Sequence, residues 1–119
     1  MRTLQWITCG DDGHWCSFDS LILSRLPADL LGVYIIWHTG NPSRVVRVGQ
    51  GYVADRVAEH RGDKEITQYR AYGSLRITWA AVPKASDRDG FERYLADMWS
   101  PLVGDAWPDV DPIAVNSPW

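Results

Sequence analysis

Two runs of β-branched and aromatic residues, joined by a short turn-forming segment, constrain this chain more than any other feature. The first run spans residues 32–37 and the second spans residues 44–48. Residues 38–43 between them are rich in Gly, Asn, Pro and Ser, which favour turns. Two such runs around a short loop predict a β-hairpin, and the glycines of segment 49–51 end its second strand.

The hydrophobic period changes immediately after this hairpin. Val53, Val57 and His60 recur at helical spacing, which predicts a helix over residues 52–61 with Gly62 at its C-terminal end. A second short helix is possible within residues 63–72.

A third strand and a final helix follow. Residues 73–82 alternate as a strand does, with Leu75, Ile77 and Trp79 on one face, and Pro83 ends it. Residues 86–100 predict a helix capped by Ser86. Its apolar stripe consists of Phe91, Tyr94, Leu95, Met98 and Trp99.

The order β-β-α-β-α predicts an α/β (α+β) fold: a small, three-stranded, mainly antiparallel sheet flanked by helices. Its 119 residues fit one domain over 1–119, with an N-terminal extension (1–31), a core (32–100) and an ordered C-terminal arm (101–119). Within the extension, residues 18–25 predict a short helix capped by Asp19 or Ser20.

Composition narrows the class of protein. Hydrophobic residues make up 45% and charged residues 23%, which is typical of a globular domain. No apolar run is long enough to span a membrane, and residues 1–6 lack the features of a signal peptide. We therefore expect a cytoplasmic protein without membrane partners.

The cysteines and tryptophans each allow two interpretations. Cys9 and Cys16, with His14 between them, could supply zinc ligands, but their spacing matches no known zinc pattern, so we expect two reduced thiols. The seven tryptophans could form a base-stacking platform, but most occupy strand or helix-face positions, which favours a role in the core.

Charge is distributed unevenly along the chain. The net charge is −3, which argues against a nucleic-acid partner. However, residues 44–84 contain eight basic and four acidic side chains, whereas residues 85–119 contain two basic and seven acidic ones. This asymmetry indicates either a localised anion-binding surface or ordinary solvated charge.

Four polar positions stand out on the expected elements. Tyr34 interrupts the apolar first strand, Arg56 and His60 share one helix face, and Glu92 lies beside the apolar stripe of the final helix. Each also has a purely structural explanation. Tyr34 would be a packed strand aromatic, and the other three would be ordinary surface residues.

In combination these residues resemble the motifs of the GIY-YIG nuclease superfamily. Gly32-Val33-Tyr34 resembles its first tripeptide and Arg47-Val48-Gly49 its second, and the resemblance covers roughly residues 32–107. Arg56 and His60 follow on a helix, and Glu92 on a later helix precedes Pro101. The family fold has a central three-stranded antiparallel sheet.

The resemblance implies a metal-dependent endonuclease that hydrolyses phosphodiester bonds in nucleic acid, with DNA as the expected form, through one Mg²⁺ or Mn²⁺. Tyr34 would orient or deprotonate the water, Arg56 would hold the scissile phosphate, and His60 would move a proton or fix the phosphate. Glu92 would be the metal ligand. The cations expected on flanking phosphates are Arg44, Arg61 and Lys64. Specificity would come from a protein partner or from the shape of the substrate, or would be absent.

The sequence departs from the family pattern at two places. Arg47 replaces a tyrosine of the second tripeptide, and we expect its charge to activate Tyr34. The asparagine that usually follows the proline is missing, and Asn116 is a distant candidate for it. Two alternatives therefore stay open: a catalytically impaired module that binds nucleic acid or a protein, and an interaction module that uses the tryptophans and the acidic arm.

Overall fold

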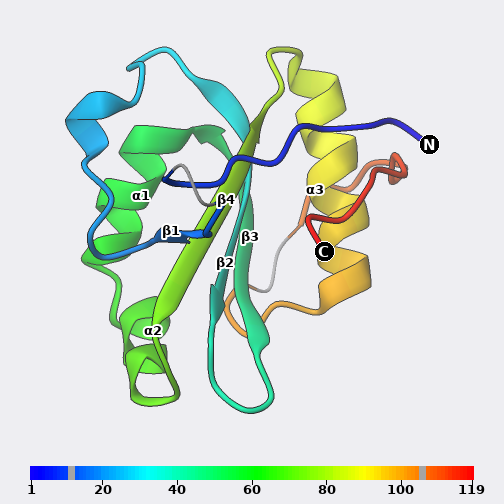
Figure 1. The fold of residues 1–119 in the computed structure, drawn as a ribbon. Helices are drawn as coiled ribbons and strands as arrows, with labels where there is room; N and C mark the ends of the chain where they lie inside the picture. The colour runs from blue at the N-terminus through cyan, green and yellow to red at the C-terminus, as the bar shows by residue number, and fades with distance from the viewer. Residues whose placement is uncertain (11–12, 105–106) are drawn as a thin grey trace.

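The computed structural model describes residues 1–10, 13–104 and 107–119. It is an α+β fold in which α1 and α2 cover one face of a sheet and α3 covers the other (Figure 1). The elements in chain order are β1 (Cys16–Ser17), the 3₁₀ helix η1 (Leu23–Arg25), β2 (Leu31–His38), β3 (Arg44–Tyr52), α1 (Val53–Arg61), α2 (Lys64–Thr67), the 3₁₀ helix η2 (Gln68–Ala71), β4 (Leu75–Ala81) and α3 (Ala85–Trp99).

The sheet has four strands in the order β1-β4-β2-β3, and every neighbouring pair is antiparallel. The three expected strands form its β4-β2-β3 part. The expected number of three strands is wrong, because β1 adds a fourth by pairing Cys16 with Ile77 and Ser17 with Arg76. A strand of two residues is too short to produce a periodic pattern in the sequence.

The central strand β2 is buried on both faces. Val33 and Ile35 belong to the hydrophobic cluster under α3, whereas Tyr34 and Ile36 belong to the cluster under α1. This alternation follows from the two-residue period of a strand. It is also what points the one phenol of β2 towards α1.

The two long helices lie within a residue or two of their expected bounds. Val53 and Val57 of α1 are fully buried, as their spacing predicts. The expected cap at Ser86 is wrong, since α3 starts one residue earlier and Lys84 precedes it without a side-chain cap. Met98 is 43% exposed, so the buried stripe of α3 is narrower than expected. Within the described residues, no helix is both long and apolar enough to cross a membrane.

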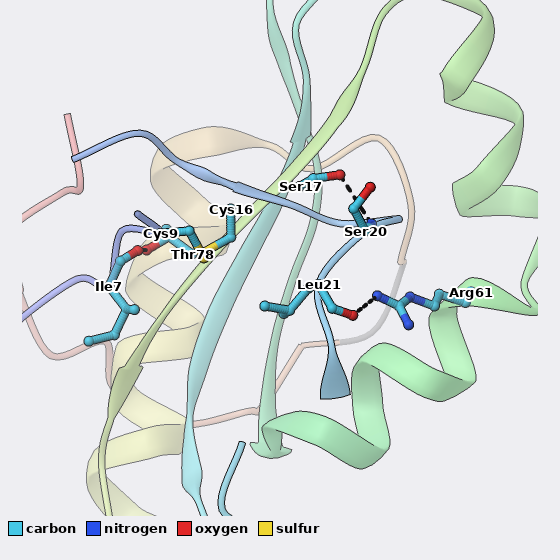
Figure 2. The surroundings of a disulfide bond; sticks show 8 residues. All are labelled: Ile7, Cys9, Cys16, Ser17, Ser20, Leu21, Arg61 and Thr78. Carbon is cyan, nitrogen blue, oxygen red and sulfur yellow. Dashed lines mark hydrogen bonds between the residues drawn. A yellow bond between two sulfur atoms is a disulfide. The ribbon is translucent and has the colours of Figure 1, made fainter. Parts of the chain in front are cut away.

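The helix expected over residues 18–25 is largely absent, and only η1 forms there. Neither Asp19 nor Ser20 caps it. The guanidinium of Arg61 binds the backbone carbonyls of Phe18 and Leu21 at 2.6–3.0 Å, and the bond from α1 to Leu21 is drawn in Figure 2. These carbonyls are therefore satisfied by a side chain from α1, which fixes an irregular segment against that helix.

Cys9 and Cys16 form a disulfide, and the expectation of two reduced thiols is wrong (Figure 2). The bond joins the N-terminal segment to β1. Nearby, the hydroxyl of Thr78 on β4 donates to the carbonyl of Ile7 at 2.7 Å, which holds the same segment along the sheet. The sequence does not show the contact of Thr78 with Ile7 because these residues are 71 positions apart. Cys9 and Cys16 are only 7 positions apart, but their spacing alone does not specify a bond. The cytoplasmic location stays a prediction.

The C-terminal arm lies on the body of the fold. Leu102 and Val103 donate backbone hydrogen bonds to Val45 and Val46 along the outer edge of β3. Further along, Val115 is fully buried and forms a parallel bridge with Arg2. Both ends of the chain therefore run beside α3 (Figure 1).

Candidate active site

A cavity of about 650 Å³ opens beside the end of β3, between α1 and α3. We refer to it as the β3-end cavity. It combines residues from β2, β3, α1 and α3. Five of its lining residues are those singled out in the sequence: Tyr34, Arg47, Arg56, His60 and Glu92. Residues far apart in the chain thus share one concave surface, as the resemblance requires.

Tyr34 and His60 form the closest polar contact in this cavity. The phenolic oxygen lies 2.6 Å from Nε2 of His60. Burial, reinforced by the charge of Arg47, lowers the pKa of His60 to about 4, so the imidazole is neutral near pH 7. Neutral Nε2 can then accept the phenolic hydrogen, and we assign the bond in this direction.

Gly49 makes room for this pair. It lies opposite Tyr34 in the β2–β3 ladder, and a Cβ at position 49 would collide with the Tyr34 ring and hydroxyl. Any other residue would displace the phenol. The glycine that resembles a family motif therefore has a direct steric role here.

Arg47 is the cation shared by the site. Its charge lowers the pKa values of Tyr34, His60 and Glu92. The charge of Arg47 opposes the effect of burial on Tyr34, but burial is the larger cause and raises the pKa of Tyr34 to about 12. Tyr34 is consequently a protonated phenol near pH 7.

The C-terminal arm packs against the side chain of Arg47. Its guanidinium carbon lies 5.3 Å from the ring centre of Trp107, a cation–π distance. A Cβ on Gly104 would collide with the same guanidinium. Nε of Arg47 is buried and has no hydrogen-bond partner within the described part of the chain. An arginine in this position still has a donor to offer a ligand.

Glu92 is a buried carboxyl group, 7% exposed, on the side of α3 that faces the cavity. Burial raises the pKa of Glu92 to about 7, against the opposing charge of Arg47. The neighbouring charge of Asp89 contributes to the rise, and a hydrogen bond with Gln50 opposes it. The carboxyl group therefore changes protonation near neutral pH. A cation bound beside it would favour its charged form.

Gln50 is a site residue that the sequence analysis missed. Its amide donates to Asp89 at 2.5 Å and accepts from Arg88 at 3.0 Å, so it links β3 to α3 beside Glu92. A signal was present: Gln50 is two residues from buried Val48, and alternation places both on the face towards α3. A polar residue at such a position usually has a buried polar partner.

Arg56 lies at the mouth of the cavity. Its guanidinium is paired with Glu59 at 3.2 Å, and both side chains are about half exposed or more. An exposed pair of this kind contributes little to stability and exchanges readily. Arg56 can therefore release Glu59 and bind an incoming phosphate at small cost.

The three cations expected on flanking phosphates lie elsewhere. Arg44 is at the opposite end of β3, where it lines a second cavity. Arg61 is bonded to the carbonyls of Phe18 and Leu21, which gives it a structural role. Lys64 is exposed at the start of α2 and does not line the β3-end cavity.

Asn116 does not replace the missing family asparagine. Its side chain accepts from the backbone nitrogen of Leu4 at 2.6 Å and donates to the Leu4 carbonyl at 3.0 Å. The side chain thus joins the arm to the N-terminal segment, away from the cavity.

The cavity offers few side chains that could hold a metal ion. Among the described residues there is no group of three or more His, Cys, Asp or Glu side chains that could hold one. Glu92 supplies one carboxylate, and Mg²⁺ accepts one or two carboxylates when waters and a substrate phosphate complete its shell. Glu92 therefore fits a Mg²⁺ or Mn²⁺ that binds together with substrate.

Comparisons with known proteins provide no assignment: family models, curated proteins and solved structures all gave no match. The functional argument therefore depends on the geometry of the cavity.

Proposed function

We propose that this chain is a metal-dependent endonuclease that hydrolyses phosphodiester bonds in nucleic acid, expected to be DNA, by a one-metal mechanism of the GIY-YIG type. The observation that supports this proposal is the meeting of Tyr34, His60, Arg56 and Glu92 in one cavity, with the phenol and the imidazole 2.6 Å apart. These are the residue types and the order that the family resemblance requires.

Tyr34 and His60 would act as a proton relay. Because the phenol donates its hydrogen to Nε2 of His60, its oxygen can still accept, and the hydrogen bond from Arg47 would leave one acceptor position for an attacking water. As a water proton passes to the phenolic oxygen, the phenolic proton passes to His60. The water becomes the nucleophile, and no phenolate forms. This route tolerates a Tyr34 pKa of about 12.

The substrate would help this relay. With a pKa of about 4, His60 is a weak base while the cavity is empty of phosphate. A phosphodiester held by Arg56 brings negative charge close to the imidazole, which raises its affinity for a proton. His60 would then be a stronger base with substrate present than without it.

Glu92 and Arg47 would stabilise charge on the phosphate. A divalent cation held by Glu92 would polarise a phosphoryl oxygen and offset the charge that develops during attack. Arg47 would donate a hydrogen bond to the same phosphate, as planar guanidinium groups do well.

Cleavage assays test the proposal directly. Single-stranded, duplex and branched DNA, and RNA, are incubated with the protein in Mg²⁺ or Mn²⁺. We expect cleavage by the wild type and its loss in Glu92→Gln and Arg56→Ala. Arg70→Ala is the matched control, because Arg70 pairs with Asp19 on another surface. Cleavage that survives Glu92→Gln contradicts the metal-ligand role.

A catalytically impaired binding module is the alternative, and Arg47 favours it. This cation already acts on the Glu92 carboxyl group, so it competes with a metal ion for the same charge. Salt-dependent binding of nucleic acid without cleavage in either metal would support this alternative. A protein partner that supplies specificity stays a prediction under both.

A further inference from the structure

A second cavity, of about 450 Å³, lies at the other end of β3 and is walled largely by tryptophans. We refer to it as the tryptophan cavity. Its volume is in the usual range for small-ligand pockets. The residues that line it are Trp15, Trp37, Ser43, Arg44, Val45, Trp99 and Trp119.

The four rings form one cluster centred on Trp119. Its ring centre lies 4.7 Å from that of Trp37, 5.4 Å from that of Trp99 and 6.0 Å from that of Trp15. Trp37 is 7% exposed, but Trp119 is 50% exposed. The expectation that the tryptophans serve the core holds for Trp37, and Trp15 and Trp99 pack against the same core cluster, whereas half of Trp119 stays exposed although its ring contacts the other three.

Two polar groups at this cavity suggest what it binds. The indole nitrogen of Trp99 is buried and has no hydrogen-bond partner among the residues that the structure describes. Because this nitrogen is buried, an acceptor on a ligand would reach it only after the ring cluster shifts. Arg44 is exposed and places a positive charge on the same cavity. A fitting ligand thus has a flat π-face, a hydrogen-bond acceptor and a nearby negative charge.

A nucleobase with its phosphate combines these three properties. Aromatic side chains bind unpaired bases by stacking, and a base inside a duplex offers no free face. Tryptophan clusters also bind methylated ammonium groups, but the charge of Arg44 opposes a cationic ligand. Charge and hydrogen bonding therefore both favour the base.

The two cavities lie on one strand. Val45 lines the tryptophan cavity and Gly49 lines the β3-end cavity, and four residues of strand separate them by roughly 13 Å. A nucleic-acid strand that bridged this span would contact both cavities. We propose that the tryptophan cavity binds an unpaired base of a strand whose phosphate occupies the β3-end cavity. The identity of the polymer rests on the proposed function.

Binding without metal separates this inference from catalysis. A fluorescent single-stranded oligonucleotide and its duplex are titrated by anisotropy in EDTA. We expect Trp119→Ala to weaken binding of the single strand about tenfold or more, and Trp119→Phe to keep most of it. Duplex binding should not change. Tyr72→Ala is the control, because Tyr72 is an exposed aromatic, 64% exposed, outside this cavity.

A second measurement locates the base. When deoxyadenosine monophosphate is added, the NMR signal of the Trp99 indole N–H should move, while that of Trp6, which donates to the Asn116 carbonyl, should not. Single-strand binding that Trp119→Ala leaves intact overturns the inference, as does a response to a trimethyl-lysine peptide in place of the nucleotide. If the tryptophan cavity binds a base but the protein cleaves no nucleic acid, the proposed function is refuted and the base-binding site stands.

Discussion

The hydroxyl of Tyr34 and Nε2 of His60 share a hydrogen bond 2.6 Å long, which joins the central strand to the first helix inside the cavity. Tyr34→Phe would leave the partly buried imidazole nitrogen without this partner. We expect the free energy of unfolding to fall by about 1–3 kcal/mol, measured by urea denaturation.

A double-mutant cycle isolates this bond. The variant Tyr34→Phe/His60→Leu replaces both partners by apolar groups, so its loss should be smaller than the sum of the two single losses. Additive losses would show that the pair contributes no coupling.

Arg47→Leu should raise three pKa values together. The charge of Arg47 lowers the pKa of Tyr34, of His60 and of Glu92, so its removal favours the protonated form of each. NMR titration of His60 and Glu92 measures two of these shifts. Movement in opposite directions would contradict the role of Arg47 as the shared cation.

Glu92→Gln should stabilise the protein at high pH and leave it unchanged at low pH. Burial raises the pKa of Glu92 from 4.5 to about 7, so the folded protein keeps this proton to a higher pH than the unfolded chain. The wild type therefore loses stability as the pH rises from about 4.5 to about 7 and loses no more above that.

Glutamine is neutral throughout, so the gain should be on the order of 3 kcal/mol at about pH 8 and near zero at about pH 4. Denaturation curves at the two pH values measure it. The same gain at both would mean that the effect is one of packing and not of charge.

Gly49→Ala should distort the site, because the new Cβ would collide with the Tyr34 ring. We expect a loss of about 1–3 kcal/mol in the free energy of unfolding. Tyr34→Ala removes the colliding ring. Gly49→Ala should therefore lower the free energy of unfolding less in the Tyr34→Ala protein than in the wild type. An unchanged cost would place the strain elsewhere.

Replacing Arg61 should affect the stability of the protein more than replacing Lys64, although the sequence predicts a phosphate contact for both. Arg61→Ala leaves the carbonyls of Phe18 and Leu21 without their donor, so we expect a loss of about 1–3 kcal/mol in stability. Lys64→Ala should change thermal stability little, since its side chain is exposed. Equal stability of the two variants would contradict the structural role of Arg61.

The sequence predicts the long periodic elements well. Strand β2 is a continuous apolar run, and strands β3 and β4 and helices α1 and α3 carry two-residue or 3.6-residue patterns that burial imposes. Strand β1 has two residues and no such pattern. The Cys9–Cys16 bond depends on how the N-terminal segment returns to β4, which local sequence does not encode.

The sequence predicts the candidate site in part as well. The family resemblance predicts Tyr34, Arg47, Arg56, His60 and Glu92 as site residues by type and order, and all five line one cavity. The flanking cations were chosen by charge alone. Charge does not determine where a side chain lies in the fold. Arg44 is at the opposite end of its strand, and Arg61 points into the N-terminal segment.

The backbone bonds from Leu102 and Val103 to β3 have a consequence for how the molecule behaves at high concentration. An exposed sheet edge is a template on which another chain can add a strand. Here the protein's own arm bonds to the outer edge of β3 at Val45 and Val46, and the other outer strand, β1, offers only two residues. The fold thus protects itself against edge-to-edge aggregation, using the same arm that holds Arg47 through Trp107.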